Sequence, residues 1–328
     1  MNELATKDAF CYDQNDLSEI LFPVELRPVF VPMPHHQQGE LLQPSDLQEI
    51  TKYKALVDVE RDHVFTIVSN DYKVITNQEA IKLGELCFQT VFKLTAPGKM
   101  QPFNIIKPET CSFCHIDFVH SDAKSDYFDN DPWTPFLRVT NSYNKTRALK
   151  FDLGFCRGIC KNGLIFGKQT IEFKFTHTKS AKNDPGARFI LKSGEFAKLE
   201  QEFIENLRNL KRFHVPRNVM WPLLCKLFDL KIPPADATDR QVDSWHAAEH
   251  LAKSKMEHYF DKLGENGYAA LNVMTDFSTR PPKVGFGPAR INTMQTNCGE
   301  WTEDFCLEIR SEDFNFAKYL GDYQRLAV

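Results

Sequence analysis

The chain has 328 residues, of which 42% are apolar, and its formal net charge at neutral pH is −4. This length and apolar fraction suffice for one large domain or two ordinary ones with a real core. No apolar run approaches the length of a membrane span, and the first thirty residues begin acidic, unlike a signal peptide, so we expect a cytoplasmic protein. The nine scattered cysteines fit reduced thiols better than a disulfide framework.

The N-terminal part predicts little regular structure before residue 60. Five prolines and a polar run place residues 22–48 in an extended surface segment rather than in a helix or strand. Two β-rich runs, residues 63–68 and 72–75, flank Ser-Asn-Asp and predict a hairpin. A helix is expected over residues 78–92, capped by Asn77. Its apolar positions are Ile81, Leu83, Leu86, Phe88 and Val91.

The middle of the chain alternates with the period of a β-strand. Residues 136–143 and 147–155 predict a hairpin that turns at Asn144-Lys145. Residues 169–177 predict a further half-buried strand. The side chains expected to point inward are Leu149, Phe151, Leu153, Phe155, Ile171, Phe173, Phe175 and His177. We therefore expect an antiparallel sheet with one aromatic face.

Helical periodicity follows the sheet. One amphipathic helix is expected from Gly194 to about Phe213, with Phe196, Leu199, Phe203, Leu207 and Leu210 on its apolar face. A longer helix begins after Thr238, where Thr-Asp-Arg-Gln forms a capping box, and ends before Gly264. Its apolar stripe comprises Val242, Trp245, Ala252, Met256, Tyr259 and Leu263. Short helices then follow, interrupted by the Pro- and Gly-rich residues 279–289.

These elements predict an α+β fold: a central antiparallel sheet with flanking helices, followed by a helical C-terminal part. We divide the chain into an irregular N-terminal segment (residues 1–60), an α+β core with a basic central sheet (61–217) and a mostly helical part packed on that core (218–328).

The charge of residues 141–192 is opposite to that of their surroundings. They carry eleven Lys or Arg against three acidic residues, whereas residues 1–140 have a net charge of −9. Such a reversal is typical of proteins that bind an anionic partner, most commonly nucleic acid. An internal contact between the acidic N-terminal part and the basic segment is the alternative.

Seven basic residues are expected on hairpin turns or outward strand positions, where they could follow a phosphate backbone. They are Lys145, Arg147, Lys150, Arg157, Lys161, Lys168 and Lys174. Tyr143, Phe155 and Phe166 lie nearby and could stack on unpaired bases, which favours single strands over duplex. The alternative places these rings in the core and the basic residues on a solvated face.

Metal-binding patterns are present but weak. Cys111 and Cys114 would point to opposite faces of a strand, and Cys156 and Cys160 would stand about 13 Å apart, so zinc is not expected there. His246-Ala-Ala-Glu249-His250 matches the HxxEH pattern of zinc hydrolases, but helix geometry turns both histidines toward solvent. A phosphate loop and a nucleophile elbow are missing, so no cofactor is expected.

Three stretches carry a family resemblance in consistent order, from about residue 60 to residue 305. They are VSNDYKVITNQEAIKLGEL, LRVTNSYNKTRALKFDLGFCRGICKNGL, and NGYAALNVMTDFST followed by Gly-Glu-Trp. The chain resembles domain of unknown function 932, a phage- and plasmid-related prokaryotic family, and this resemblance implies a DNA-linked role in mobile elements. Members usually show Asp-Gly where this chain has Asn144-Lys145, and this turn stays feasible because Asn tolerates a left-handed backbone.

We therefore expect a non-enzymatic protein that binds nucleic acid, with single-stranded DNA favoured, in DNA protection, annealing or recombination. Self-association would suit such a role. Two alternatives remain open. The first is a module that binds a host defence protein through its acidic surface. The second is a zinc-dependent hydrolase that uses His246, Glu249 and His250.

Overall fold

The structure is a computed structural model of the chain, and it describes residues 11–12, 17–33, 43–92, 100–120, 131–157, 162–166, 172–175 and 185–327. Among these residues the chain forms two antiparallel sheets and a helical C-terminal half, as the α+β prediction requires. No described helix is both long and apolar enough to span a bilayer. The three-part division of the chain stays a prediction.

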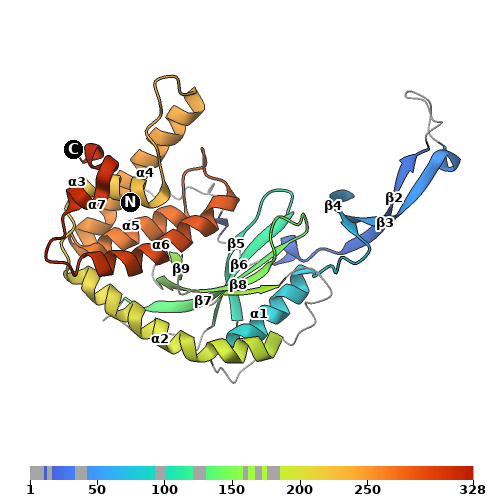
Figure 1. Cartoon of the computed structure of the whole chain (residues 1–328), viewed down its shortest axis with the longest axis horizontal. Helices are drawn as coiled ribbons and strands as arrows, with labels where there is room; N and C mark the ends of the chain where they lie inside the picture. Colours follow the sequence, from blue (N-terminus) through green and yellow to red (C-terminus); the bar gives the residue numbers. More distant parts are fainter. Residues whose placement is uncertain are drawn as a thin grey trace.

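The larger sheet has seven strands in the described residues, in the order β1-β5-β6-β7-β8-β10, with β9 also paired to β8. Its strands are β1 (Cys11–Tyr12), β5 (Met100–Ile106), β6 (Phe113–His120), β7 (Trp133–Ser142), β8 (Leu149–Arg157), β9 (Gly163–Ile165) and β10 (Glu172–Phe175). The pairing of β7 with β8 confirms the predicted central hairpin. Figure 1 shows α1 (Asn77–Phe92) and α2 (Pro185–Arg212) along one side of this sheet.

Both faces of the central strands are buried, which the sequence did not predict. The four apolar side chains expected to point inward from β8 are all inaccessible to solvent. Gly154 and Cys156, on the opposite face of β8, are buried too, and so is the carboxylate of Asp152. The second face lies against α6 (Pro288–Glu308), whose Asn292 reaches Arg138 of β7. The prediction of a sheet with one solvated face was therefore wrong for these strands.

A three-stranded arm projects from the body of the molecule (Figure 1). It consists of β2 (Val24–Pro32), β3 (Leu47–Asp58) and β4 (His63–Ser69), in that order. The expectation that residues 22–48 form no regular element was thus wrong for β2. Its prolines are tolerated because β2 is an edge strand with a bulge between Pro28 and Phe30. The predicted hairpin was also wrong, since β4 pairs with β3 and residues 72–75 form no strand.

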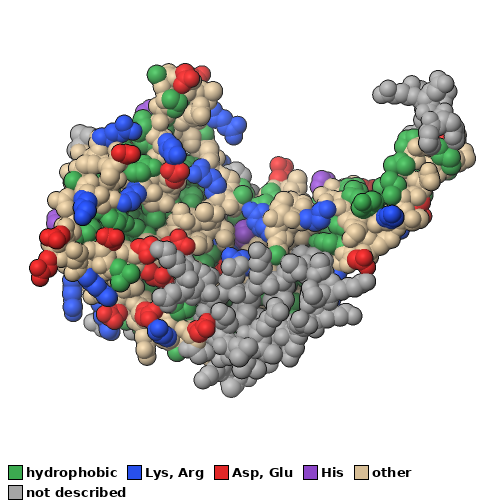
Figure 2. All heavy atoms as spheres, in the orientation of Figure 1, with side chains coloured by type: hydrophobic (Ala, Val, Ile, Leu, Met, Phe, Trp, Pro, Cys, Tyr) green, Lys and Arg blue, Asp and Glu red, His purple; other side chains and the backbone are tan. Residues whose placement is uncertain are grey.

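The arm joins the body through a small aromatic cluster. Phe22, Leu56, Cys111 and Tyr143 are buried together at its base. Farther out, Figure 2 shows hydrophobic side chains gathered on the arm. Phe30 of β2 and Val64 of β4 are about half exposed, at 49% and 52%. The base of the arm is therefore part of a packed core, whereas its outer strands bury much less apolar surface.

The helices confirm most of the periodicity but not every boundary. The five predicted apolar residues of α2 are buried, although α2 begins earlier than expected, at Pro185. The predicted capping box, Thr238 with Gln241, starts α4 (Asp239–Leu263). In α1 the cap is Thr76, which exchanges hydrogen bonds with Glu79. Asn77, the predicted cap, is buried instead. Of the predicted apolar positions of α1, Phe88 and Val91 are buried, Ile81 and Leu83 are partly buried against the core, and Leu86 is exposed.

The C-terminal half packs around a fully buried helix. This helix is α5 (Gly267–Thr279), and every one of its residues is buried. The other elements of this half are α3 (Arg217–Phe228), α4, α6 and α7 (Phe316–Leu320). Short 3-10 helices span Ser18–Ile20, Pro44–Asp46 and Gly321–Leu326. Tyr268 of α5 accepts a hydrogen bond from the indole of Trp133 in β7, so the two halves share one core.

Candidate nucleic-acid interface

The aromatic rings proposed to stack on bases are buried in the core. Tyr143 packs between Phe22 and Phe65, with ring centroids 5.7 and 5.2 Å away. Its hydroxyl accepts a hydrogen bond from the backbone N–H of Asn77 at 2.9 Å. Phe155 and Phe166 are also buried, and their rings meet edge to face. Tyr143 as a base-stacking residue was therefore a wrong prediction, because burial leaves no ring face open to a ligand.

Arg157 is also absent from the surface. Its guanidinium makes a bidentate ion pair with Asp131, at 2.5 and 2.7 Å, and donates to Asn272 Oδ1 at 3.1 Å. The side chain is only 8% exposed. The prediction of an outward strand position was wrong here. The acidic N-terminal part compensates this cation internally, as the alternative interpretation of the charge reversal proposed.

Three other predicted residues, Lys145, Arg147 and Lys150, lie around the turn between β7 and β8. Lys145 has a left-handed backbone, with φ 60°, and donates a hydrogen bond to Ile67 O of the arm at 2.8 Å. The guanidinium of Arg147 lies 3.8 Å above the ring centroid of Phe113, and partial burial lowers its pKa. Lys161, Lys168 and the side chain of Lys174 lie outside the described residues.

Lys150 stands at the edge of the buried polar face of the sheet. Its ammonium lies 2.8 Å from Asp152 Oδ1, and its side chain is one-quarter exposed. Two cross-strand rows make up this face. The first is Asn104, Asp117, Arg138 and Asp152, and the second is His115, Thr140 and Lys150.

Arg138 is the most deeply buried cation of this face. It donates two hydrogen bonds of 2.6 Å to the carboxylate of Asp117 and one of 3.2 Å to Asn292. The sequence interpretation missed Arg138, Asp117 and His115. The available signal was their alternation with apolar residues in Cys-His-Ile-Asp-Phe and Leu-Arg-Val-Thr, which places them on one strand face.

A cavity of about 280 Å³, here called the turn cavity, opens beside these rows. It is lined by His115, Thr140, Thr146, Arg147, Ala148, Lys150 and Asn292. A hydrogen bond of 2.7 Å joins His115 Nδ1 to Thr140 Oγ1. The other ring nitrogen, Nε2, is buried and has no hydrogen-bond partner among the described residues. The lining therefore combines two cations with several neutral polar groups and includes no carboxylate.

The electrostatic setting of His115 keeps its imidazole neutral. Burial lowers its pKa well below the ordinary value of 6.5, and the positive charges of Arg138, Arg147 and Lys150 lower it further. A neutral imidazole can offer one donor and one acceptor without adding charge to the cavity.

We expect His115 to make the folded protein less stable as the pH falls below about 6.5. As the pH drops, histidine in the unfolded chain takes up a proton, whereas buried His115 does not. The unfolded state is therefore favoured by up to about 1.4 kcal/mol per pH unit until the native pKa is reached. Urea unfolding at pH 6.5, 6.0 and 5.5 should show a smaller decline for His115→Asn than for the natural chain. The same change at exposed His250 is the control, and equal slopes for both variants would contradict this assignment.

The metal-binding motifs do not converge in the structure. The side chain of His246 is 69% exposed, and the carboxylate of Glu249 accepts a hydrogen bond from Lys253 at 2.8 Å. His250 is also exposed. Cys111, Cys114 and Cys156 belong to three different hydrophobic clusters. Cys160 lies outside the described residues. Within the described part of the chain, no group of three or more potential ligands is placed to hold a metal ion.

Comparison with known proteins gives a family and no activity. A family model described as domain of unknown function 932 (DUF932) matches residues 64–297. The match begins in β4 and ends within α6, so it includes every residue that lines the turn cavity. No curated protein and no solved structure matches the chain.

Proposed function

The chain belongs to the DUF932 family, and we propose that it binds single-stranded nucleic acid, with DNA favoured, through the turn cavity. The observation that carries this proposal is the lining of that cavity. Arg147 and Lys150 stand at one recess together with the polar side chains of Thr140, Thr146 and Asn292. A phosphate needs charge-assisted hydrogen bonds from several directions, and such a lining can provide them.

The arrangement of Arg147 favours a single strand over a duplex. One face of its guanidinium lies on Phe113, so the planar group is held in place and its other face can stack on an unpaired base. A flexible strand can also turn one phosphate and its sugar into a recess of about 280 Å³. A duplex presents its bases paired and stacked, and it offers Arg147 only its phosphates.

One observation weighs against each of the two alternatives. Asp117 and Asp131 lie in buried pairs with Arg138 and Arg157, so these carboxylates do not contribute to an acidic docking surface. The exposed histidines of α4 likewise offer no supported metal site. The proposal includes a role in DNA protection, annealing or recombination in a phage or plasmid. It also includes a cytoplasmic location and self-association.

The proposal is tested by replacing Arg147 with glutamine. We expect binding of a single-stranded oligonucleotide to weaken about tenfold at low salt, because one charge-assisted phosphate contact is lost. The slope of log K against log salt should fall by roughly one. Gel-shift titrations at two salt concentrations, with single-stranded DNA, duplex DNA and RNA, measure both effects.

Arg217→Gln is the matched control. Arg217 also lies over an aromatic ring, 5.8 Å from the centroid of Phe260, and carries two ion pairs, but it is remote from the turn cavity in the helical half. It should bind like the natural chain. Unchanged affinity in Arg147→Gln, or binding insensitive to salt, would reject the proposal. Lys150 is less suitable for charge reversal because a carboxylate there would face buried Asp152.

A further inference from the structure

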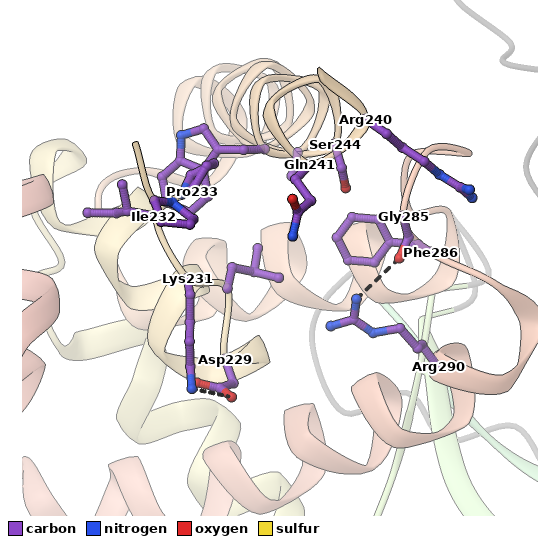
Figure 3. A pocket seen from close by; sticks show the side chains of 14 residues that line it. Asp229, Lys231, Ile232, Pro233, Arg240, Gln241, Ser244, Gly285, Phe286 and Arg290 are labelled. Atoms are coloured by element: carbon purple, nitrogen blue, oxygen red, sulfur yellow. Dashed lines mark hydrogen bonds and ion pairs between the residues drawn. The ribbon is translucent and has the colours of Figure 1, made fainter. Parts of the chain in front are cut away.

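A second cavity, here called the α4–α6 groove, lies in the helical half. It has a volume of about 350 Å³ and is bounded by the loop after α3, the first two turns of α4 and the loop before α6 (Figure 3). Its lining residues are Asp229, Leu230, Lys231, Ile232, Pro233, Pro234, Arg240, Gln241, Ser244, Trp245, Ala248, Gly285, Phe286 and Arg290. Gln241 and Phe286 point into the groove from opposite sides (Figure 3).

The groove has an aromatic wall that is held rigidly. Trp245 packs edge to face on Trp221, with centroids 5.1 Å apart, and Phe286 packs in the same way on Phe277 at 5.7 Å. Trp245 is the partly exposed tryptophan of the chain, whereas Trp133, Trp221 and Trp301 are buried. Phe286 is only 3% exposed, so the aromatic surface open to a flat ligand is the ring of Trp245. Because this ring is already held in place, its contact with a ligand costs little entropy.

The same groove is electropositive. Lys231, Arg240 and Arg290 line it against a single acidic residue, Asp229. Asp229 lies 3.6 Å from Lys231 Nζ and accepts a hydrogen bond from Tyr323, so the charges of Asp229 and Lys231 offset each other. Arg240 and Arg290 therefore account for the positive charge of the lining. Arg290 donates to Gly285 O at 3.2 Å and lies 4.9 Å from the centroid of Phe286, at the floor of the groove (Figure 3).

The helix that carries Arg290 adds to this positive potential. α6 begins after Gly287 with no side-chain cap and with no acidic residue in its first turn. The positive end of its dipole is therefore not offset by a neighbouring carboxylate on the same helix. A group that carries negative charge would be stabilised beside Arg290.

We infer that the α4–α6 groove binds a nucleotide, with its base against Trp245 and its phosphate beside Arg290. An aromatic wall next to a cationic floor matches a ligand that joins a flat ring to an anionic group. The nucleotide can be free, or it can be one unit of a bound strand, and this second source rests on the proposed function. The two cavities share α6, because Arg290 lines the groove and Asn292 lines the turn cavity.

Tryptophan fluorescence tests the inference directly. Thymidine 5′-monophosphate should quench the emission of Trp245, and thymidine, which has no phosphate, should bind about tenfold more weakly. Quenching should disappear in Trp245→Leu. In Arg290→Gln the mononucleotide should bind roughly tenfold more weakly, because a charge-assisted contact is lost. Lys262→Gln, an exposed change on α4 outside the groove, is the matched control and should leave the titration unchanged.

An oligothymidylate titration distinguishes the two sources. If Arg290→Gln binds both the mononucleotide and the oligonucleotide more weakly, the groove binds one unit of a strand. If it binds only the mononucleotide more weakly, the groove binds a free nucleotide. If the mononucleotide quenches the fluorescence of the natural chain but the oligonucleotide does not bind to it, the proposed function is wrong and the groove assignment is supported. Absence of quenching by either ligand, or equal quenching in Trp245→Leu, overturns the groove assignment whatever the gel shifts show. Thermal unfolding of each variant verifies that it is folded.

Discussion

Replacing Asp117 with alanine should lower the free energy of unfolding by about 3–5 kcal/mol. Arg138 is fully buried, and Asp117 supplies two of its hydrogen bonds, both at 2.6 Å. Without that carboxylate the guanidinium loses its bidentate ion pair, and the 3.2 Å hydrogen bond to the neutral amide of Asn292 on α6 supplies no counter-charge. A buried cation that loses its counter-ion cannot recover its hydration. Urea denaturation at neutral pH measures the loss.

The double variant Asp117→Leu with Arg138→Met separates charge pairing from packing. Because it removes both charges, it should recover most of the stability lost in Asp117→Ala. A double-mutant cycle completed with the single variants Asp117→Leu and Arg138→Met then gives the coupling between the two residues. A loss below about 1 kcal/mol in Asp117→Ala would contradict this account, since it would mean that water reaches Arg138.

The interior of the central sheet was only half predictable from sequence. The alternation of Leu149, Phe151, Leu153 and Phe155 correctly predicted one buried face of β8. Lys150 and Asp152 between them resemble a solvated face, because a polar residue looks the same in sequence whether water or a distant partner satisfies it. The elements that cover this face, such as α6 with Asn292, lie more than a hundred residues away.

The same long-range pairing explains why the local charge was misleading. A count over residues 141–192 includes Arg157, whose counter-ion Asp131 lies outside that window. Of the described predicted cations, Arg147 remains the strongest candidate for contact with an external anion. Net charge in a window thus overstates the positive surface wherever a counted cation pairs with an acidic residue outside the window.

The arm shows how a local turn can be chosen wrongly. Ser-Asn-Asp after β4 is a turn signal, but so is the run from Asp58 to Asp62 before it. Asp58 accepts hydrogen bonds from the backbone N–H groups of Glu60 and Arg61, and Asp62 adopts a left-handed backbone. These bonds close the turn between β3 and β4. The pairing partner of β4 therefore lies before it in the chain rather than after it.

Asn-Ser-Tyr, residues 141–143 at the end of β7, is structural at all three positions. Asn141 donates to Ile75 O and to Asn77 Oδ1, and Tyr143 accepts from Asn77 N. Ser142 donates to Asn144 Oδ1, which also accepts from Thr146. Asn-Ser-Tyr therefore joins β7 to the start of α1 and to the base of the arm. This location gives the three residues of Asn-Ser-Tyr a structural role.

Lys145 takes a left-handed backbone conformation in the turn between β7 and β8, where glycine would be less strained. Its φ of 60° lies in the left-handed region that glycine occupies most easily. The Lys145 side chain also donates to Ile67 O of β4. This chain therefore accepts some backbone strain at the turn and gains a contact between the turn and the arm.

Replacing Gly154 with alanine should cost about 3 kcal/mol, the upper end of the usual range for overpacking a core. A Cβ atom at this position would lie 2.2 Å from the backbone oxygen of Leu164 and 2.7 Å from the ring of Phe136. The backbone oxygen cannot move without disturbing the pairing of Gly154 with Ile165. Urea denaturation measures the loss, and hydrogen exchange at Ile165 should speed up if β9 separates from β8.

Gly287→Ala is the matched control, because no atom lies within 4 Å of its added Cβ and its φ is −96°. It should change stability by no more than about 0.5 kcal/mol. Equal stability of both variants would contradict the close approach of β9 to β8, and with it the burial of the second face of the sheet.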